Sequence, residues 1–464
     1  MANKFNRRSF IKTAAIAGAG ITLVPNTAFA EKKKPIPSET KVRIAFIGVG
    51  LRGRNHVSNI SKNSDVEIVA FADISAEAVA ESQKIIKADG RAKAEEFILG
   101  PTDYLRMLKK QNIDGVVIST PWEWHAKMAV DTMKAGKYAG LEVSAATTLE
   151  QCWDLVDTYE ATGVPCMILE NVCYGRQELA MLNMVKKGIF GEVVHARCGY
   201  LHDLRGIKFN NGVEFGEKAK SEAQWRTNFS EKMNADVYPT HGLGPIAVAL
   251  DINRGNRFVS ITSTATKSRG LHEYIVEHPK GGENHPNAKI KWKLGDVVTS
   301  TITTSRGETI IVTHDTNVPR PYSLGFKLQG TDGLIEFDGL ESGGIKQPDG
   351  SYLNTDRIYI EGKTEPHEWE SAAKWFKEYD HPLWAKFEAE AKNTGHGGID
   401  FFVAKEFVDA IKEKREPELD VYDAAAWSAV TPLSEMSIQE NGEPQAFPDF
   451  TRGKWMNRKA IEIK

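Results

Sequence analysis

Short apolar segments alternate with helix-like segments over residues 41–170. The apolar segments are rich in β-branched and aromatic residues, which is typical of strands buried on both faces of a parallel sheet. The expected strands are 42–48, 66–72, 115–120, 138–143 and 167–170, and the expected helices are 75–88, 125–135 and 149–161. Ser75 stands at the expected N-cap of the first of these helices. Strands joined by crossover helices indicate a doubly wound α/β domain.

The pattern changes after residue 170. Strand-like segments now follow one another, and one helix-like segment interrupts them at 244–253. The expected strands are 193–200, 258–266, 297–305, 309–314, 323–329 and 333–337, and helices are expected at 400–414 and 422–441. Consecutive strands favour an open, largely antiparallel sheet with helices on one face. We therefore expect two domains, an α/β domain over 41–170 and an α+β domain over 171–464.

Composition and charge exclude several classes of protein. The chain has 464 residues, a length that suits two or three domains. Apolar residues are 41% and charged residues 26%, which is the balance of a globular protein rather than of a disordered or polytopic membrane protein. The net charge is −3, so there is no basic excess that would bind a nucleic-acid backbone.

Residues 1–30 read as an export signal. They begin with a positively charged stretch, continue with an apolar run over 13–24 and end in the small-x-small pattern Ala28-Phe29-Ala30. The apolar run is shorter than the roughly 20 residues that cross a bilayer, so we expect no membrane span. Residues 31–40 are rich in Lys and Pro and read as a linker.

Two adjacent arginines, Arg7 and Arg8, stand in the charged stretch, and Phe10 and Lys12 follow them. This pattern resembles a twin-arginine signal. The alternative is an ordinary secretory signal that happens to contain two arginines. The twin-arginine export machinery moves folded proteins, often with a cofactor already inside. We therefore expect a periplasmic or secreted protein with a tightly held organic cofactor.

The cysteines do not indicate a metal centre. None shows the close paired spacing that is typical of a zinc site, so we expect no metal. An exported protein can form disulfides, but a chain that folds in the cytosol closes its core with reduced thiols, which we expect here. The four cysteines are Cys152, Cys166, Cys173 and Cys198.

Gly48, Gly50 and Gly53 form a G-x-G-x-x-G motif between the first expected strand and a helix. In this context the first glycine permits a tight turn, the second lets the backbone approach a pyrophosphate, and the third allows close helix–strand packing. Asp73 ends the second expected strand, where a carboxylate would bind a ribose diol and repel a 2′-phosphate. The motif indicates a Rossmann-type NAD site. The alternative is a glycine turn in another kind of doubly wound protein.

Side chains at later strand ends would face the same crevice. Trp122 and Trp124 follow the third main strand, where they could wall a nicotinamide or a sugar, or pack with no ligand. Glu142 and Val143 end another strand, and Asn171 follows the last one. These positions are candidates for ligand contacts.

The motifs together resemble the glucose–fructose oxidoreductase and inositol dehydrogenase family. Besides the glycine motif, the resemblance rests on Thr120-Pro121, Ala135-Gly136-Lys137 and Asp423-Ala424-Ala425. Members join an N-terminal NAD(P) domain to a C-terminal open sheet. Their dehydrogenases usually carry Glu-Lys-Pro after Ala-Gly-Lys, and that lysine does proton chemistry. Here the position reads Glu142-Val143-Ser144, which argues against an ordinary sugar dehydrogenase.

A narrower resemblance accounts for this departure. The chain resembles glycoside hydrolase family 109, which contains exported bacterial α-N-acetylgalactosaminidases that use NAD although the net reaction is hydrolysis. The carrying segments are Gly50–Arg54, Trp122–His125, Gly140–Val143, Glu170-Asn171, Tyr238–Pro245 and Asp251–Gly255. The resemblance implies that NAD is held by Leu51, Arg52, Asp73, Trp122, Glu123, Trp124, His125, Glu142, Val143, Asn171 and Tyr238. It implies that the sugar is held by Tyr200, Arg226, Tyr238, Pro239, Thr240, His241 and Tyr322.

Such a reaction does not need the two flanking carboxylates of most glycosidases. NAD⁺ takes a hydride from C3 of the sugar, and the resulting ketone acidifies the C2 proton. A base removes that proton and the C1 substituent is eliminated. Water adds to the enone, and the hydride then returns to the sugar. The cofactor ends as it began, so we expect it to stay bound and to be recycled in each turnover.

This scheme needs groups that move protons near neutral pH. His241 is expected to take the C3 hydroxyl proton, because imidazole titrates in this range unaided. Tyr238 is a second candidate, since a cationic nicotinamide would lower a phenol pKa. Tyr200 and Tyr322 are candidates for the C2 base or for leaving-group contact, and the sequence does not separate them. Arg226 is expected to bind sugar hydroxyls or the acetamide, because arginine stays charged.

Simpler roles stay open for several candidates. His241 could be a core or capping histidine, His125 a helix cap, and Tyr200 and Tyr322 sheet-packing residues. No role is assigned to His202, His272, His278, His285, His396, Arg205 or Arg269.

Two other functions compete with the glycosidase. One is an NAD(P)-dependent sugar oxidoreductase that acts on a free sugar or sugar derivative and passes the hydride to a second substrate. The other is a non-catalytic sugar-binding or assembly protein that keeps NAD as a structural part. The α-linkage and the N-acetylgalactosamine preference rest on the resemblance, and the aglycone stays open. An exposed sheet face is compatible with a homodimer.

Overall fold

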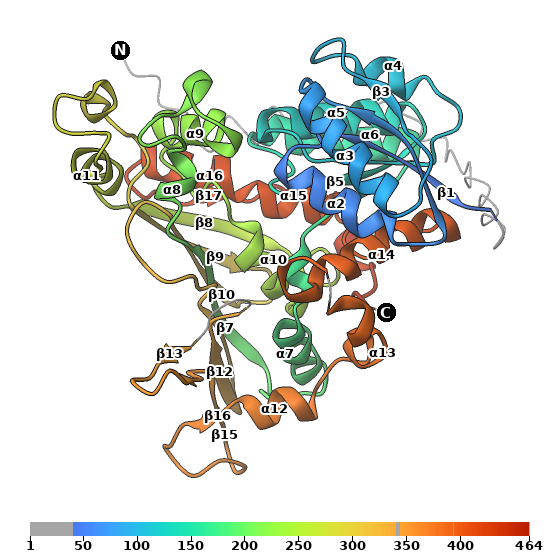
Figure 1. The fold of residues 1–464 in the computed structure, drawn as a ribbon. Helices are drawn as coiled ribbons and strands as arrows, with labels where there is room; N and C mark the ends of the chain where they lie inside the picture. The colour runs from blue at the N-terminus through green and yellow to red at the C-terminus, as the bar shows by residue number, and fades with distance from the viewer. Residues whose placement is uncertain (1–39, 340–343, 393, 464) are drawn as a thin grey trace, which may run out of the picture. The chain divides into compact units, whose positions relative to one another are not determined.

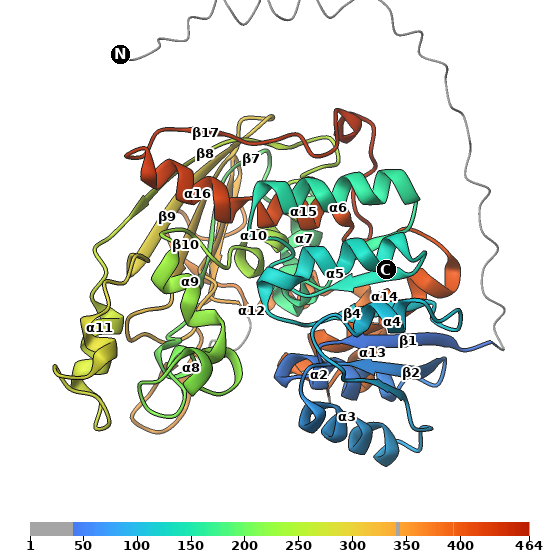
Figure 2. The same cartoon turned by 90° about the horizontal axis from the view of Figure 1, so that it is seen from above.

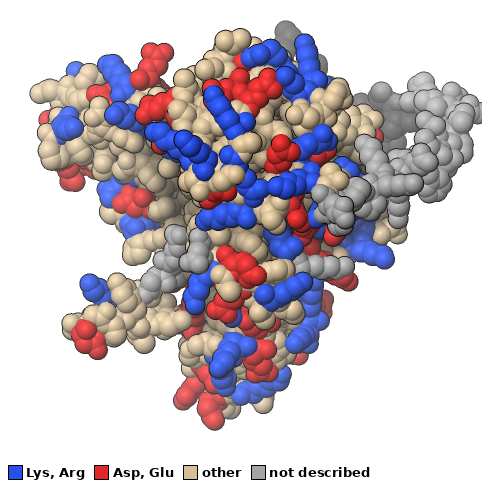
Figure 3. All heavy atoms as spheres, turned by 45° about the vertical axis from the view of Figure 1, so that its right-hand side comes forward, with Lys and Arg blue, Asp and Glu red and all other residues tan. Residues whose placement is uncertain are grey.

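The protein is described by a computed structural model over residues 40–339, 344–392 and 394–463 (Figure 1). The predicted export signal and all of the linker except Thr40 lie outside these residues. Among the described residues, no helix combines the length and apolar character needed to span a bilayer. On the face drawn in Figure 3, Lys and Arg are interspersed with Asp and Glu rather than gathered in a field of one sign.

The N-terminal sheet has six parallel strands in the order β3-β2-β1-β4-β5-β6. The strand order reverses between β1 and β4, as in a doubly wound fold, so the predicted α/β class is confirmed. The strands are β1 (Val42–Ile47), β2 (Val66–Ala72), β3 (Glu95–Phe97), β4 (Gly115–Ile118), β5 (Tyr138–Leu141) and β6 (Cys166–Ile168). The short strand β3 escaped prediction because it has too few apolar residues to form a pattern.

Helices cover both faces of this sheet, with α2 and α3 on one side and α5 and α6 on the other (Figure 2). They are α2 (Leu51–Ser61), α3 (Ala76–Ala88), α4 (Tyr104–Leu108), α5 (Trp122–Lys134) and α6 (Leu149–Thr162). Ser75 caps α3 as predicted, since its side chain accepts a hydrogen bond from the Ala78 N–H at 3.1 Å. Helix α5 begins at Trp122 rather than at 125, directly after Pro121. The segment Trp122–His125 therefore forms the first helical turn and is not an extended strand end.

The second sheet is open and has nine strands in the order β16-β15-β12-β11-β7-β10-β9-β8-β17. Neighbouring strands are antiparallel except for the parallel pair β7–β10, which agrees with the predicted largely antiparallel sheet. Its strands are β7 (Val193–Leu201), β8 (Phe258–Ala265), β9 (Val297–Thr304), β10 (Thr309–Asp315), β11 (Phe326–Gly330), β12 (Gly333–Phe337), β15 (Arg357–Ile360), β16 (Glu370–Ser371) and β17 (Gln445–Ala446). A separate hairpin pairs β13 (Ile345–Lys346) with β14 (Tyr352–Leu353).

The remaining helices pack around both sheets. They are α7 (Arg176–Lys186), α8 (Arg205–Lys208), α9 (Arg226–Lys232), α10 (Thr240–Ala249), α11 (Gly270–Glu277), α12 (Ala373–Glu378), α13 (Pro382–Ala391), α14 (Ile399–Glu413), α15 (Val421–Ser428) and α16 (Val430–Gln439). The helix predicted at 244–253 starts and ends about four residues earlier, because Pro245 lies inside α10 rather than at its start. The helix predicted at 422–441 is divided into α15 and α16 at Ala429.

Two glycines bring α10 directly onto β7. A Cβ on Gly242 of α10 would lie 2.5 Å from the backbone nitrogen of Gly199 in β7. No side chain fits between helix and strand at this crossing. His241 and Tyr200, the neighbours of these glycines along the chain, are therefore held next to each other, with ring centroids 5.5 Å apart.

Helix α14 packs on the N-terminal sheet although it lies near the other end of the chain (Figure 1). A Cβ on Gly140 of β5 would lie 2.9 Å from the Phe407 ring, and one on Gly115 of β4 would lie 2.4 Å from Ile411. These strand glycines let α14 approach closely. The first turn of α14 consequently lies beside α2, next to the glycine motif.

The four cysteines are free and buried, which confirms the expectation of reduced thiols. Burial raises the pKa of the Cys166 thiol to about 12, so the thiol stays protonated and unreactive. Among the described residues, no group of three or more His, Cys, Asp or Glu side chains is placed to hold a metal ion.

Candidate active site

The turn between β1 and α2 has the geometry of a phosphate-binding loop. Gly48 has a φ of +82°, which glycine adopts without strain. A Cβ on Gly53 would lie 2.1 Å from the Gly48 carbonyl oxygen, whereas a Cβ on Gly50 would meet no atom within 4 Å. Helix α2 has neither a capping side chain nor an acidic residue in its first turn. Its first N–H groups can therefore face a pyrophosphate, so the residues present fit a dinucleotide.

Asp73 follows β2 and anchors this turn. Its Oδ2 accepts a hydrogen bond from the Val49 N–H at 2.7 Å, and its Oδ1 accepts one from the Ser75 N–H at 2.8 Å. The side chain is half-buried at the strand end where Rossmann folds bind the adenosine ribose. A fixed carboxylate here would repel a 2′-phosphate, which favours NAD over NADP.

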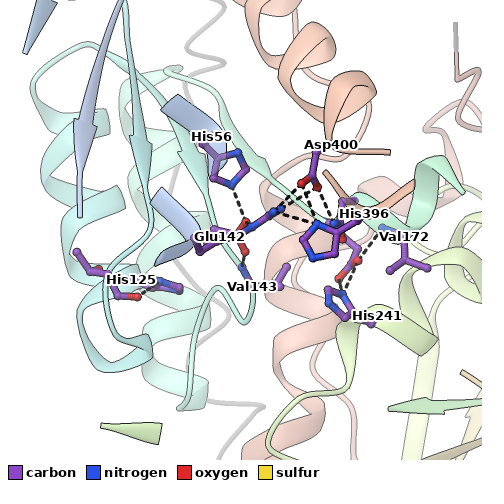
Figure 4. Close-up of polar contacts among 12 residues, drawn as sticks. His56, His125, Glu142, Val143, Val172, His241, His396 and Asp400 are labelled. Atoms are coloured by element: carbon purple, nitrogen blue, oxygen red, sulfur yellow. Dashed lines mark hydrogen bonds and ion pairs between the residues drawn. The ribbon is translucent and has the colours of Figure 1, made fainter. Parts of the chain in front are cut away.

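Arg52, in the first turn of α2, joins three elements. Its Nε donates to Oε1 of Glu142 at 2.6 Å. Its terminal nitrogens donate to both carboxylate oxygens of Asp400, at 2.8 and 3.1 Å. Glu142 follows β5, and Asp400 lies in the first turn of α14. The guanidinium therefore ties the glycine turn to a strand end and to a helix from the far end of the chain (Figure 4).

Both acids bonded to Arg52 are held in their charged form. Burial alone would raise the pKa of Glu142, but Arg52 and His56 outweigh it and hold that pKa well below its usual range. Burial likewise opposes ionisation of Asp400, and its hydrogen bond from His396 together with Arg52 lowers the pKa further than burial raises it. Charge pairing thus outweighs desolvation at both carboxyls.

The His125 side chain is occupied by backbone contacts. Its two ring nitrogens lie 2.6 Å from the Thr120 carbonyl oxygen and 2.8 Å from the Ser144 carbonyl oxygen. The residue is buried, and burial lowers its pKa. The ring therefore braces the start of α5 against the loop after β5, but neither contact is to a helix N–H, so His125 does not cap α5.

An acid–base pair, made of the buried Glu170 and the half-buried His241, lies at the N-terminal end of α10. Nδ1 of His241 is 2.7 and 3.0 Å from the two carboxylate oxygens of Glu170, the residue that follows β6 and Leu169 (Figure 4). Glu170 also accepts a hydrogen bond from the Val172 N–H at 3.0 Å. On the other side of the imidazole, Nε2 lies 3.5 Å from the Tyr238 hydroxyl. A carboxylate on Nδ1 selects the tautomer whose Nε2 is a free base.

Aromatic rings surround this pair. Tyr238 stacks on Trp122 with ring centroids 5.4 Å apart, and Tyr200 lies 4.7 Å from Tyr238. The Tyr200 hydroxyl is 3.1 Å from Nδ1 of His202, whose ring meets Tyr322 edge-on at 4.9 Å. Rings arranged in this way offer flat apolar surfaces together with hydroxyl groups, a combination suited to a sugar.

Arg226 adds a buried positive charge to the aromatic group. Its guanidinium carbon lies 4.8 Å from the centroid of Tyr238 and 5.0 Å from that of Trp122, and the side chain forms an ion pair with Glu222. Such cation–π contacts hold the guanidinium plane in a fixed orientation. Arg226 can therefore present its remaining N–H groups to hydroxyl or carbonyl oxygens.

Burial dominates the titration of Tyr238 and its neighbour Asp236. Desolvation raises the pKa of Tyr238 well above its usual value, and the nearby charge of Arg226 opposes that rise. It raises the pKa of Asp236 to about 7. Oδ1 of Asp236 accepts a hydrogen bond from the Tyr238 N–H at 3.1 Å. A buried acid with a raised pKa thus contacts the backbone of Tyr238.

Comparison with known families gives two adjoining matches. Residues 42–170 match the profile "Oxidoreductase family, NAD-binding Rossmann fold". Residues 174–457 match the profile "Glycosyl hydrolase 109, C-terminal domain". The chain belongs to glycoside hydrolase family 109. The expected resemblance is therefore confirmed, and this glycoside hydrolase carries an NAD-binding Rossmann domain.

Relatives of this family 109 chain match along nearly its whole length. The "Alpha-N-acetylgalactosaminidase" of Tannerella forsythia is 47% identical, with 97% of this chain and 98% of that protein covered. A family 109 protein of Parabacteroides distasonis is 48% identical with the same coverage.

Two solved structures share the fold at low sequence identity. Levoglucosan dehydrogenase in complex with NADH and L-sorbose is 17% identical with a TM-score of 0.64, covering 88% of this chain and 99% of that one. Scyllo-inositol dehydrogenase from Lactobacillus casei with bound NAD(H) and scyllo-inositol is 12% identical with a TM-score of 0.60 and the same coverage.

In this fold the rings of Tyr200, Tyr238, His241 and Tyr322 lie in one group, and Arg226 packs against it. Pro239 is the N-cap residue of α10 and Thr240 its first residue. The buried Thr240 hydroxyl has no hydrogen-bond partner among the described residues, which leaves it available to a ligand that reaches it. A cavity of about 480 Å³ also borders Tyr322, but its lining includes neither His241 nor Tyr238.

The predicted cofactor residues differ more in their surroundings. Leu51 is 57% exposed beside the glycine turn, whereas Val143 is buried. Glu123 is exposed and Trp124 is half-buried against the core. The Asn171 side chain donates to Asp400 at 2.8 Å, so its amide contacts protein.

Three residues of this enzyme escaped sequence reasoning. Glu170 was noticed only as part of a motif, although its place directly after a strand and Leu169 puts it at the same sheet edge as Asn171. His202 was assigned no role, although it lies two positions after Tyr200 and strand alternation puts such residues on one face. No local signal marks Asp400, which reaches the glycine turn only through the packing of α14.

Proposed function

We propose that this chain is an exported glycosidase that removes terminal α-linked N-acetylgalactosamine from glycans by NAD-dependent oxidation, elimination, water addition and reduction. The name of the T. forsythia relative supports the substrate. One observation carries the chemistry: the half-buried His241, held by the buried Glu170, lies against the tyrosines of the sugar-binding group. An imidazole base held in one tautomer is what hydroxyl oxidation requires.

The proposed cofactor is NAD that stays bound and is recycled in each turnover. Gly48, Gly50 and Gly53 would hold its pyrophosphate, and Asp73 its adenosine ribose. When bound, NAD⁺ accepts a hydride from a ring carbon of the sugar and returns it later in the same turnover. Tyr238 and Trp122 would flank the region where the reacting ring lies.

We assign the hydroxyl proton to His241. Glu170 accepts the Nδ1–H, so the lone pair of Nε2 faces Tyr238 and the sugar. Nε2 takes the proton of the hydroxyl that is oxidised, and the Glu170 carboxylate stabilises the imidazolium that forms. The proton returns from Nε2 when the carbonyl is reduced. Glu170 holds the ring and does not need to change its own protonation state.

We assign the C2 proton to Tyr200 rather than to Tyr322. The Tyr200 hydroxyl has a basic partner in His202, at 3.1 Å, which can accept the phenolic proton as the phenolate takes the C2 proton. Burial lowers the pKa of His202, with Arg226 adding to the effect, so the imidazole is neutral and available as an acceptor. Tyr322 packs edge-on against His202 and keeps that ring in place.

Arg226 is proposed to bind the acetamide carbonyl or ring hydroxyls. Its position over the faces of Trp122 and Tyr238 fixes the direction of its N–H groups. A positive charge next to the Tyr200 and Tyr238 hydroxyls also favours their ionised forms.

We also propose the twin-arginine route and a periplasmic or secreted location, which rest on Arg7, Arg8 and the apolar run that follows them. Export after folding suits an enzyme whose cofactor must be inserted before it leaves the cytosol. A homodimer is part of the proposal, since alternate residues along β9 and β10 are only partly buried, so the chain does not fully cover one face of the second sheet.

A sugar oxidoreductase is the competing function, because solved structures that share this fold include levoglucosan dehydrogenase and scyllo-inositol dehydrogenase. The position of the family's usual lysine is Val143 here, which disfavours it. The two functions differ in stoichiometry. A glycosidase releases free sugar with no added NAD and no net NADH.

The deciding experiment assays the purified mature protein on a panel of nitrophenyl N-acetylhexosaminides of both anomers. The proposal expects nitrophenol release from the α-galacto compound, no lasting rise in absorbance at the NADH band, and deuterium at C2 of the product in heavy water. Release that needs added NAD in stoichiometric amounts would identify an oxidoreductase. Sugar binding without C2 exchange would identify a binding protein.

A further inference from the structure

The residues around Asp400 connect the start of α14 to the glycine turn. Asp400 is fully buried, and its carboxylate is bonded by Arg52, by the Asn171 amide and by His396. The three partners come from α2, from the segment after β6 and from the loop that precedes α14. The Asp400 carboxylate thus bonds both to the turn that would bind pyrophosphate and to the loop before α14 (Figure 4).

The loop before α14 is built to turn sharply at this place. His396, Gly397 and Gly398 have φ values of 49°, 66° and 108°. A run of left-handed residues is a conformation that mainly glycine tolerates, and here it folds the loop back onto Arg52. His396 remains 44% exposed in its side chain while its Nδ1 lies 2.8 Å from Asp400 and 3.4 Å from Arg52. The loop is therefore an exposed segment that one buried charge holds from the inside.

The charges of Arg52, Glu142 and Asp400 indicate that Arg52 cross-links α2 to α14. Two carboxylates, Glu142 and Asp400, already bond to its guanidinium, so its positive charge is compensated within the protein. A residue whose main task was to neutralise phosphate would be expected to carry an uncompensated charge. Instead, the pairing joins α14 to α2 across the motif that binds the dinucleotide.

We propose that the loop 394–398 and Asp400 form a latch, by which we mean a segment that keeps bound NAD from leaving its site. Arg52, next to the glycine turn, holds the latch closed by binding the Asp400 carboxylate. While the latch is closed, the pyrophosphate region is covered from the side of α14, and the cofactor can neither leave nor enter. Asp400 and His396 are positioning residues in this view and take no part in the proton transfers. The inference rests on the proposed function, in which NAD stays bound through repeated turnovers. It names the residues that slow the release of NAD.

Gly395 offers a sharp test because its substitution strains the latch without changing any charge. Its φ is −62°, which alanine adopts freely. A Cβ there would nevertheless lie 2.5 Å from Oδ2 of Asp400, an atom that Arg52 and His396 hold in place. Gly395→Ala should therefore displace the Asp400 carboxylate. Gly206→Ala is the matched control, since a Cβ at Gly206 meets no atom within 4 Å.

Two further variants test the same latch. Asp400→Asn removes the buried negative charge, and His396→Ala removes the loop side chain that bonds to it. Asp409→Asn is the control on the same helix, because Asp409 pairs with Lys405 at the half-exposed surface. The full-length mature protein is loaded with radiolabelled NAD and chased with excess unlabelled NAD, and the retained label is followed with time. Association of NAD with the stripped protein is measured by protein fluorescence.

The latch predicts that Gly395→Ala, Asp400→Asn and His396→Ala each release NAD at least about tenfold faster, the size expected from losing a charge-assisted hydrogen bond. It also predicts faster association, because an open cover speeds entry as well as exit, whereas a damaged site speeds exit alone. Both controls should match the parent. Release within twofold of the parent in His396→Ala and Gly395→Ala, or faster release with unchanged association, overturns the inference.

These outcomes are separate from the fate of the proposed function. A protein that binds no NAD at all contradicts the proposed function before the latch is in question. A protein that holds NAD and hydrolyses the α-galacto substrate, but whose latch variants exchange NAD as slowly as the parent, contradicts the latch alone. His396→Ala changes a half-exposed loop residue, so it keeps the test available if Asp400→Asn does not fold.

Discussion

The cofactor region and the sugar region treat buried carboxyl groups in opposite ways. Next to the glycine turn, Glu142 and Asp400 are each bonded to Arg52, and their pKa values are held well below the usual range. Beneath Tyr238, Asp236 is equally buried but no cation pairs with it among the described residues, and its pKa is raised to about 7. The carboxyl groups of the cofactor region thus stay charged, whereas Asp236 in the sugar region can take up a proton.

Glu170 differs from both kinds of carboxyl group in its partner. It is fully buried like Asp400, but its partner is the imidazole of His241, a group that can itself gain or lose a proton. The difference suits the two tasks. A cofactor that must remain in place is best held by groups of fixed charge, while a reaction that moves protons needs partners whose charge can change.

The largest expected effect comes from breaking the proton-moving side. His241→Ala should lower turnover by ~100- to 10,000-fold, the usual contribution of a positioned acid–base group. The content of bound NAD should stay at one per chain, because His241 does not contact the glycine turn. Turnover is measured with the nitrophenyl substrate and NAD by absorbance after denaturation. His195→Ala, a half-buried histidine bonded to Thr309, is the control. Unchanged turnover in His241→Ala would reject the assignment.

Removing the ion pairs of the cofactor region should instead lower the free energy of unfolding. Arg52→Met leaves Glu142 and Asp400 buried without their cation, which costs about 3–5 kcal/mol when one partner of a buried pair is removed. The measurement is urea unfolding followed by circular dichroism. Arg106→Met is the control, because the arginine of its pair with Asp103 is 53% exposed, so we expect a much smaller loss of stability. A loss below about 1 kcal/mol for Arg52→Met would show that the pairing is not essential to the fold.

The two kinds of carboxyl also predict different pH windows of stability. Glu142 and Asp400 have lowered pKa values, so their contribution is present above about pH 4 and is lost as the pH falls further. Asp236 has a raised pKa of about 7, so the folded state binds its proton more tightly than the unfolded chain. Its contribution is present below about pH 4 and is lost as the pH rises towards 7.

Asp236→Asn should therefore flatten the fall in stability between about pH 4 and pH 7. A pKa of about 7 in place of about 3.9 corresponds to at most about 4 kcal/mol across this window. Urea unfolding of the parent and the variant at several pH values measures the slope, and the slope does not depend on any constant offset from the new amide. Parallel pH profiles would mean that Asp236 titrates normally.

The smallest expected effect concerns substrate recognition. Arg226→Lys keeps the charge but loses the planar group that lies over Trp122 and Tyr238. We expect KM to rise about tenfold with a smaller change in kcat, which corresponds to about 1.4 kcal/mol of binding. Steady-state kinetics on the nitrophenyl substrate measures both constants. A fall in kcat at unchanged KM would instead place Arg226 in the chemical step.

Much of the fold followed from local patterns. The parallel strands were predicted from their apolar runs, the N-cap from Ser75, and the phosphate turn from its three glycines. Element boundaries were less accurate. Helix α10 starts at Thr240, before the segment of strongest helical pattern, because Pro245 is tolerated inside it. Helix α5 starts at Trp122, which turned an expected strand end into a helix turn.

The candidate site followed from the sequence only in part. His241 and Tyr238 lie three positions apart in one segment, so a motif could point to both. Glu170 lies 71 positions from His241, and its role became visible only when the segment after β6 was placed next to α10. His202 became a partner of Tyr200 because the strand end holds both on one face.

The sequence by itself determined where the chain must turn tightly, which segments are buried strands and which residue types can move protons, because these depend on neighbours within a few positions. The tertiary structure alone decided which groups meet. Arg52 and Asp400 are 348 positions apart and are joined because the strand glycines let α14 approach the N-terminal sheet. Whether a buried carboxyl stays charged depends on such distant partners, since desolvation penalises every buried charge and only a nearby cation or hydrogen bond outweighs it.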